Sequence, residues 1–332
     1  MAEVDISIVT YRPDPALFAR LVESLAEPAA GLTRNLLVQD NSRDPDAAAS
    51  LEGLIAPWRE AFAGVDIARS GANLGFGRGQ NAAIARGSAP WILILNQDCV
   101  VEPGVLAPLV EGAARDPKEI AAWELRQVPY EHPKAYDPVT MDTPWASGAA
   151  MLVRREAFEA VRGFEPRIFM YGEDVDLSWR LRAKGWRIVY RPRFAVVHET
   201  YREAGEVKPL QVLGGVLTNL KLRARYGGIL AVLRGLAMLW GELLAPRSFR
   251  GRRRGLARAG LAFFWLWPYF AWTRVKPAPG FRPVFSGWGY ELRRDGAFVP
   301  FASHRGEAPG ARPLVSILIR TVDRSAWLRE AL

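Results

Sequence analysis

The chain has 332 residues, 49% of them hydrophobic and 24% charged, which suits a large buried core and excludes an ordinary disordered chain or a multi-span membrane protein. Its single cysteine, Cys99, excludes a disulfide framework and any zinc site built on several thiolates. The net charge of +9 is uneven, because residues 219–277 hold 12 Lys and Arg against one acid and leave −2 for the rest.

The chain opens on a strand pattern, with no basic region followed by an apolar segment, so we expect a cytoplasmic protein. The first 200 residues then alternate between strand and helix patterns. Strands are predicted at 5–11, 35–40, 65–70, 91–96 and 121–128, and helices at 15–25, 45–54, 80–86 and 103–114. This alternation predicts an α/β fold, with a mainly parallel sheet flanked by helices on both faces.

Polar residues gather where three of the predicted strands end. These are Thr10-Tyr11, Asp40-Asn41-Ser42 and Asn96-Gln97-Asp98. In an open parallel sheet, ligands bind at the edge where the strands have their carboxyl ends. A carboxylate at Asp40 can accept a hydrogen bond from a base N–H or a ribose hydroxyl, although an ordinary Asx turn also explains it. Asp98 is placed to hold Mg²⁺ or Mn²⁺ against a diphosphate.

A glycine-rich segment, 73–81, follows the third strand. Its residues Gly75, Gly77 and Gly79 would let the backbone pass close to a ligand, and the next helix would offer N–H groups to phosphate. The spacing is not that of the dinucleotide fingerprint, which also follows a first strand. The segment therefore argues against a nicotinamide enzyme.

Three acids crowd the first turn of a helix predicted after Gly172. Acids favour a helix N-terminus, which is one explanation, and a general base at Asp174 or Glu173 is the other. The small residues Ser147 and Gly148 upstream would let an acceptor approach. His198 follows a later strand and is either structural or a ligand.

The basic segment at 219–277 also holds two apolar runs, 229–244 and 256–272. Neither is an uninterrupted span of the length that a membrane-crossing helix needs, and Arg258 and Pro268 interrupt the second. Arginine beside tryptophan and phenylalanine suits a helix that lies in the headgroup region of an anionic leaflet. A helical subdomain with a solvated arginine face is the alternative. No nucleic-acid motif accompanies the charge, so we expect no nucleic-acid partner.

The end of the chain is read as a linker at 280–312 followed by a strand and helix at 313–332. Ser316-Ile317-Leu318 resembles Ser7-Ile8-Val9, and each is followed by a polar turn and a leucine-containing run. We interpret 313–332 as the start of a second, similar domain, with a chance strand–helix tail as the alternative.

Taken in order, Thr-Tyr, Asp-Asn-Ser, Asn-Leu-Gly-Phe-Gly, Leu-Asn-Gln-Asp, Ser-Gly-Ala, Gly-Glu-Asp-Val-Asp-Leu-x-x-Arg and Val-His resemble the family 2 glycosyltransferases with a GT-A fold. The resemblance covers about residues 4–225 and is greatest to the rhamnosyltransferase-type members that build bacterial surface polysaccharides. It implies a Rossmann-like GT-A domain at 1–218, followed by a basic, membrane-proximal helical segment at 219–279.

The resemblance also implies a role for each motif. Asp98 and His198 would bind the metal, and Asn96 stands where the family's D-x-D motif has its first acid. Asp174, in the Glu173–Asp174 pair, would be the catalytic base. The donor nucleotide would lie against Thr10, Tyr11, Asp40, Asn73, Gly75 and Asn96, and the acceptor would lie against Ser147 and Gly148.

The implied activity is an inverting glycosyl transfer that depends on Mn²⁺ or Mg²⁺. The expected donor is dTDP-L-rhamnose, with a UDP-hexose or UDP-galactofuranose left open. The acceptor would be a glycan or lipid-linked glycan at the inner face of the plasma membrane. A nucleotidyltransferase would need a glycine-rich loop after the first strand, which Thr10-Tyr11-Arg12-Pro13 lacks. A degenerate transferase domain that binds glycan or scaffolds a partner enzyme is the other alternative.

Overall fold

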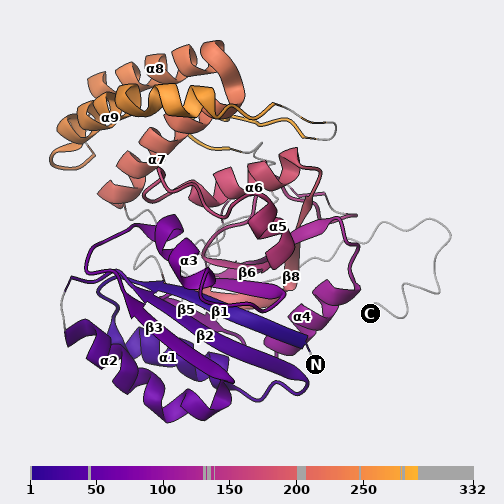
Figure 1. The fold of residues 1–332 in the computed structure, drawn as a ribbon. Helices are drawn as coiled ribbons and strands as arrows, with labels where there is room; N and C mark the ends of the chain where they lie inside the picture. The colour runs from indigo at the N-terminus through magenta and orange to yellow at the C-terminus, as the bar shows by residue number, and fades with distance from the viewer. Residues whose placement is uncertain are drawn as a thin grey trace, which may run out of the picture.

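A computed structural model describes residues 2–43, 46–129, 132, 136–137, 139–199, 207–246, 248–276, 278 and 281–290. Within these residues, an eight-stranded sheet lies between two layers of helices, and a separate group of helices caps one end (Figure 1). The α/β class with a C-terminal helical segment is therefore confirmed. The interpreted second domain at 313–332 lies outside the described residues.

The sheet is mixed and mostly parallel. Its strands are β1 (Ala2–Thr10), β2 (Leu32–Asp40), β3 (Gly64–Arg69), β4 (Trp91–Asn96), β5 (Cys99–Val101), β6 (Ile120–Val128), β7 (Ala150–Arg154) and β8 (Arg187–His198). They lie in the order β3-β2-β1-β4-β7-β6-β8-β5. Strands β1 to β4 pair in parallel, whereas β7 runs antiparallel to both β4 and β6. The carboxyl ends of β1, β2 and β4 consequently meet at one edge, as expected.

The helices of the sheet layers follow the strands along the chain. They are α1 (Pro15–Ala26), α2 (Asp46–Ile55), α3 (Phe76–Ile84), α4 (Leu106–Arg115), α5 (Arg155–Ala160) and α6 (Glu173–Ala183), with a 3₁₀ turn at Ala56–Ala61. Helix α1 begins where the side chain of Asp14 accepts hydrogen bonds from the backbone N–H groups of Ala16 and Leu17. Figure 1 shows α1, α2 and α4 on one face of the sheet, with α3, α5 and α6 on the other.

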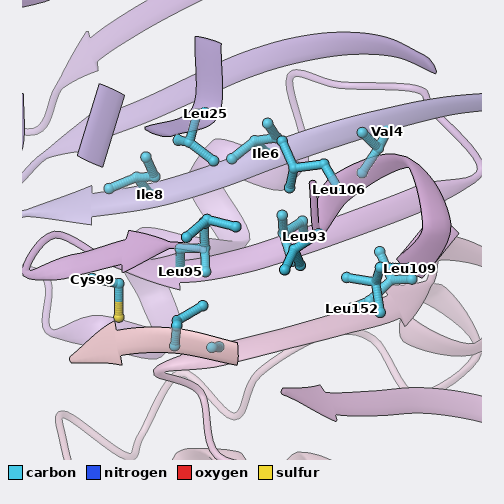
Figure 2. Close-up of a cluster of buried hydrophobic side chains, with 14 of the residues drawn as sticks. Val4, Ile6, Ile8, Leu25, Leu93, Leu95, Cys99, Leu106, Leu109 and Leu152 are labelled. Atoms are coloured by element: carbon cyan, nitrogen blue, oxygen red, sulfur yellow. The ribbon is translucent and has the colours of Figure 1, made fainter. Parts of the chain in front are cut away.

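Successive strand residues point to opposite faces, which gives the sheet two buried cores. On β4, Leu93 and Leu95 join the cluster under α1 and α4, which Figure 2 shows with Ile6 and Ile8 of β1. Ile92 and Ile94 of the same strand join the cluster under α3, α5 and α6. The continuous apolar run of β4, residues 91–95, is thus explained, because both faces of the strand are covered.

Helix α3 begins earlier than the sequence predicts, at Phe76 rather than residue 80. Gly77 and Gly79 therefore lie inside the helix and not in a ligand-binding turn. A Cβ on Gly77 would lie 2.9 Å from Phe164 Cβ, and one on Gly79 would lie 2.9 Å from Val9 Cγ1. Both glycines thus allow close packing of the helix on the protein itself.

The cap at the end of the molecule consists of α7 (Pro209–Leu222), a π-helical turn (Arg223–Gly227), α8 (Gly228–Leu244) and α9 (Arg252–Trp272). The predicted domain boundary at 218/219 falls inside α7. The π turn makes Pro209–Leu244 one continuous helical stretch, and by length and composition it is the one span among the described residues that could cross a membrane. Only 17% of its most apolar window is buried inside the protein.

The exposed side of α8 and α9 carries large apolar residues, which we call the apolar face. Within each helix these positions are one, three, four or seven residues apart, so they form a stripe along one side. Arg254 and Arg258, also exposed, lie on the same side of α9. The apolar face consists of Ile229, Leu230, Leu233, Trp240 and Leu244 on α8, and Leu261, Phe264, Trp265 and Trp272 on α9.

Residues 281–290, predicted as part of a linker, pack against the cap and against α6. We call them the strap. Trp179 of α6 forms edge-on contacts with Phe285 and Tyr290 of the strap, with ring centroids 5.3 and 5.7 Å away. One hydrophobic cluster therefore contains residues from α6, the cap and the strap.

Candidate active site

Strand pairing brings Asp98 and His198 together across 100 residues of chain. Strand β5 runs antiparallel to β8, with Cys99 opposite His198. The loop residue Asp98, just before β5, consequently lies with its Oδ1 3.3 Å from His198 Nε2. The ligand atoms of Asp98, Cys99 and His198 all lie within 4.8 Å of one another.

A glutamine at the end of β6 orients the histidine. His198 Nδ1 lies 2.9 Å from Gln127 Oε1, which is an acceptor, so Nδ1 carries the proton. The lone pair of Nε2 then faces Asp98, and the Nδ2 of Asn96 lies 3.2 Å from it. A ligand histidine usually has its second nitrogen held in this way.

The residues at this point fit a hard divalent cation. Although burial opposes it, the pKa of Asp98 falls below its ordinary value when His198 is protonated, because the imidazolium then donates a hydrogen bond and carries a charge. The neutral imidazole offers the Nε2 lone pair instead. Burial raises the pKa of the Cys99 thiol well above its ordinary value, so the sulfur keeps its proton and is a poor ligand. One carboxylate and one imidazole remain, which leaves positions for the phosphate oxygens of a substrate.

The predicted nucleoside pocket lies at the ends of β1 and β2. Thr10 Oγ1 and the backbone N–H of Ser42 donate to Asp40 Oδ1 over 3.0 and 2.9 Å. Asp40 is fully buried, and its Oδ2 has no hydrogen-bond partner within the described part of the chain, with Arg69 Nε 3.7 Å away. A buried acceptor of this kind can take a hydrogen bond from a ligand.

The side chain of Gln97 links the predicted nucleoside pocket to the loop that carries Asp98. The N–H of Tyr11 donates to Gln97 Oε1 over 2.8 Å, and the Gln97 amide returns a hydrogen bond to Tyr11 O over 3.3 Å. The ring of Tyr11 is partly exposed at this edge. The end of β1 is thus fixed beside the loop that carries Asp98.

The glycine-rich segment joins the same edge through Asn41. Asn73 Oδ1 accepts from the N–H of Gly75 over 3.0 Å, and Asn41 Nδ2 donates to Gly75 O over 3.0 Å. Gly75 has φ +80°, and a Cβ there would collide with the backbone oxygen of Phe169. Glycine is therefore required where the chain enters α3.

The three acids of α6 differ in their surroundings. Glu173 and Asp176 are buried, whereas Asp174 is half-buried. Burial, followed by the charge of Asp174, raises the pKa of Glu173 to about 8. Asp174 Oδ2 accepts from the N–H of Gly148 over 3.0 Å. Of the two candidate bases, Asp174 is the more exposed.

A single short segment, 147–149, lies between the chain that carries Asp98 and the side chain of Asp174. Ala149 O accepts hydrogen bonds from the N–H of Asn96 over 2.9 Å and from Cys99 Sγ over 3.3 Å. The next residue back, Gly148, donates to Asp174 as described above. The two halves of the predicted site therefore share one piece of backbone.

The predicted acceptor residues have different surroundings. Gly148 lies against the Asp174 side chain and the ring of Phe76. Ser147 is buried, its N–H donates to Glu124 Oε1 over 3.0 Å, and its hydroxyl accepts from the N–H of Ala149 over 3.3 Å. The observed contacts of Ser147 thus hold the 147–149 segment in shape.

Sequence reasoning missed Asn41, Gln97 and Gln127 as positioning residues. Asn41 and Gln97 belong to the polar motifs at the ends of the predicted strands, but roles were assigned there to the acids Asp40 and Asp98. Gln127 is a polar residue at the end of a predicted strand, and that position was its only local signal. Its contact with His198 depends on the parallel pairing of β6 with β8.

Comparisons with known proteins show what this chain is similar to. The glycosyl transferase family 2 model matches residues 5–162, and the glycosyltransferase-like family 2 model matches residues 139–211. An N-acetylglucosaminyl-diphospho-decaprenol L-rhamnosyltransferase of Mycobacterium tuberculosis is 29% identical, and the match covers 74% of this chain and 94% of that protein. The O-antigen biosynthesis protein RfbC of Myxococcus xanthus is 28% identical over 58% of this chain and 17% of its own length.

The fold also has a counterpart among solved structures. The mannosyltransferase PcManGT from Pyrobaculum calidifontis, in complex with GDP-Man and Mn²⁺, superposes with a TM-score of 0.52 at 15% identity. The match covers 81% of this chain and 82% of the mannosyltransferase. The likeness supports the GT-A-like architecture. The family 2 models and the relatives show that this chain is a glycosyltransferase similar to the rhamnosyltransferases of family 2.

Proposed function

We propose that this chain transfers L-rhamnose from dTDP-L-rhamnose to a lipid-linked glycan in bacterial surface polysaccharide synthesis, with inversion at the anomeric carbon. The proposal is supported by the 147–149 segment, which accepts hydrogen bonds from Asn96 and Cys99, on either side of Asp98 in the chain, and donates one to Asp174. A donor diphosphate at the pair and an acceptor hydroxyl at Asp174 would then lie on either side of one short backbone segment.

In the proposed reaction, Asp174 is the general base. The acceptor oxygen attacks the anomeric carbon, the bond from that carbon to the β-phosphate oxygen breaks, and the acceptor proton passes to the Asp174 carboxylate. Of the three acids in the first turn of α6, Asp174 is the one that is not buried, which suits a single displacement. The hydrogen bond from Gly148 keeps Oδ2 in place, because it fixes the carboxylate relative to the 147–149 segment.

The donor would be held by the sheet edge. Asp40 Oδ2 would accept from the base or ribose, with Thr10 and Ser42 holding the other carboxylate oxygen. Asp98 and His198 would hold Mn²⁺ or Mg²⁺, and a bound cation would neutralise the charge that develops on the leaving diphosphate. The neutral amide of Asn96 adds less charge to this site than the family's first acid would.

The sugar and acceptor are inferred from relatives. The Mycobacterium tuberculosis relative is named for rhamnosyl transfer to a decaprenol-linked N-acetylglucosamine, and its match extends over nearly all of its length. A polyprenyl acceptor is anchored in a membrane. The exposed apolar face with its arginines supports a peripheral position at the inner face of the plasma membrane.

The test measures transfer from dTDP-L-rhamnose to a GlcNAc-diphospho-polyprenol, with UDP-galactose and UDP-galactofuranose as competing donors. We expect transfer from dTDP-L-rhamnose that chelation abolishes and added Mn²⁺ or Mg²⁺ restores. Asp174→Asn should lower kcat by about 10²- to 10⁴-fold, because it removes the base and keeps the shape of the side chain.

Glu159→Gln, an exposed acid on α5, is the matched control and should leave kcat unchanged. Full activity of Asp174→Asn would show that this residue is not the base. Transfer from a UDP-sugar but not from dTDP-L-rhamnose would confirm that the chain is a glycosyltransferase and would show that its donor sugar is not rhamnose. Binding of glycan without turnover of any donor would favour a scaffolding domain.

A further inference from the structure

A buried arginine of the cap reaches the helix that carries the candidate base. Arg225 lies in the π-helical turn between α7 and α8, and only 2% of its side chain is exposed. Its Nη1 lies 2.8 Å from Asp176 Oδ1, and its Nη2 lies 2.6 Å from Glu165 Oε2. Single π turns inside longer helices are frequent at functional sites.

Arg225 helps to fix the first turn of α6. Asp176 lies two residues after Asp174, and the Tyr226 hydroxyl also donates to its Oδ1 over 3.0 Å. Arg180 Nε donates to the other oxygen, Oδ2, over 2.7 Å. Each oxygen of this buried carboxylate is thus held by a charged donor, and such bonds are short and directional.

The same guanidinium joins two further segments to α6. Glu165 begins the stretch leading to Phe169, whose backbone oxygen accepts from the N–H of Phe76 at the start of α3. Nη2 of Arg225 also donates to Thr273 Oγ1 at the end of α9, over 2.9 Å. Arg225 therefore links three parts of the chain. These are helix α6 with the candidate base, the 165–169 segment that contacts the start of α3, and the cap.

We propose that Arg225 is a positioning residue for the transfer reaction, holding the first turn of α6 so that Asp174 stays against Gly148. The proposal rests on the role of Asp174 as base. A base displaced by about 1 Å can cost about 10²-fold in rate. Binding of dTDP should change little, because the contacts that hold Asp40 do not involve Arg225. The loss should therefore fall on kcat.

The chain offers a matched control in Arg223 of the same π turn. Arg223 is 4% exposed, close to the value for Arg225. Its contacts are with the cap and the strap, since Nε donates to Asn219 Oδ1 over 2.7 Å and Nη2 donates to Gly287 O over 2.8 Å. Arg223→Lys thus removes a comparable buried guanidinium without removing a partner of Asp176.

The experiment compares Arg225→Lys with Arg223→Lys in the full chain. It measures kcat and KM for dTDP-L-rhamnose, dTDP binding with Mn²⁺ by calorimetry, and hydrogen exchange at the amides of 173–178. In Arg225→Lys we expect kcat to fall by about 10- to 100-fold, dTDP affinity to stay within about twofold, and exchange in α6 to rise. Arg223→Lys should keep kcat within about threefold and leave α6 exchange unchanged.

Equal losses in both variants, or an unchanged kcat in Arg225→Lys, would overturn the proposal. If Arg225→Lys fails to fold, Tyr226→Phe removes one hydrogen bond from Asp176, and kcat should then fall by about 3- to 10-fold with unchanged dTDP affinity. If the wild-type chain transfers nothing from dTDP-L-rhamnose, the proposed function fails. The exchange comparison then decides alone whether Arg225 holds α6, since equal exchange in the two lysine variants would contradict it.

Discussion

At the scale of single residues, Glu173 gives folding a pH dependence of its own. Burial and the Asp174 charge raise its pKa to about 8, from an ordinary value of 4.5. Between about pH 5 and 8, the folded chain therefore holds a proton that the unfolded chain releases. The free energy of unfolding should fall as pH rises through this window, because the unfolded state binds fewer protons.

Glu173→Gln removes this titration while keeping the size of the side chain. Between about pH 5 and 8, we expect the free energy of unfolding of the variant to change less than that of the wild type. Near pH 8 it should exceed the wild-type value by roughly 2 to 4 kcal/mol. Urea unfolding at several pH values measures it. Glu159→Gln, an exposed glutamate on α5, should follow the wild-type profile. Parallel profiles for wild type and Glu173→Gln would mean that Glu173 is ionised throughout.

Single residues also show what a sequence can reveal of a site. The pairing of Asp98 with His198 was expected from the family resemblance, and the structure brings their ligand atoms to 3.3 Å. No local pattern contains that contact, because it follows from the pairing of the three-residue strand β5 with β8. Gln127 was missed for the same reason, since its role depends on the register of two strands far apart in the chain.

At the scale of elements, the five predicted strands are all present, whereas no range was predicted for β5, β7 or β8. Strand β4 matches its predicted range. Its short, continuous apolar run is typical of a strand that is buried on both faces of a sheet. The start of α3 was predicted too late, since Gly77 and Gly79 locally favour a turn. Their packing against Phe164 and Val9 is a tertiary effect that outweighs this preference. The strap was read as a linker because its aromatic anchors have no periodicity.

Two glycines in helices should respond in opposite directions to the same substitution. A Cβ at Gly77 of α3 would lie 2.9 Å from Phe164 Cβ, so Gly77→Ala should lower the free energy of unfolding by roughly 1 to 3 kcal/mol. Gly112 of α4 has open space around its Cβ position, so Gly112→Ala should raise it by roughly 0.5 to 1 kcal/mol. Urea unfolding of both variants measures the difference. Stabilisation by Gly77→Ala would contradict the close packing of α3.

At the scale of the whole molecule, the charge and the apolar surface lie at one end. The cap lies beyond α6, at the opposite end from α1 and α2 (Figure 1). It carries the apolar face, with Trp265 and Trp272 87% and 84% exposed. Arginines next to exposed tryptophans complement an anionic lipid surface, because the rings enter the headgroup region while the charges stay near the phosphates. The cap also shares a hydrophobic cluster with α6, so a membrane at this face would lie close to the active site.

This face predicts binding to vesicles that contain phosphatidylglycerol. Replacing Trp265 and Trp272 with serine should weaken vesicle co-sedimentation by about tenfold or more, because two large apolar side chains no longer enter the interface. Trp58→Ser, at an exposed tryptophan near α2, should bind as the wild type does. Binding should weaken in 1 M salt, where the Debye length is about 3 Å, and on neutral vesicles.

If the tryptophans instead join two copies of the chain, the double variant would change the oligomeric state in sedimentation equilibrium and leave vesicle binding intact. That outcome would show that Trp265 and Trp272 do not carry membrane binding, while the contacts between Arg225 and α6 would still tie the cap to the candidate base.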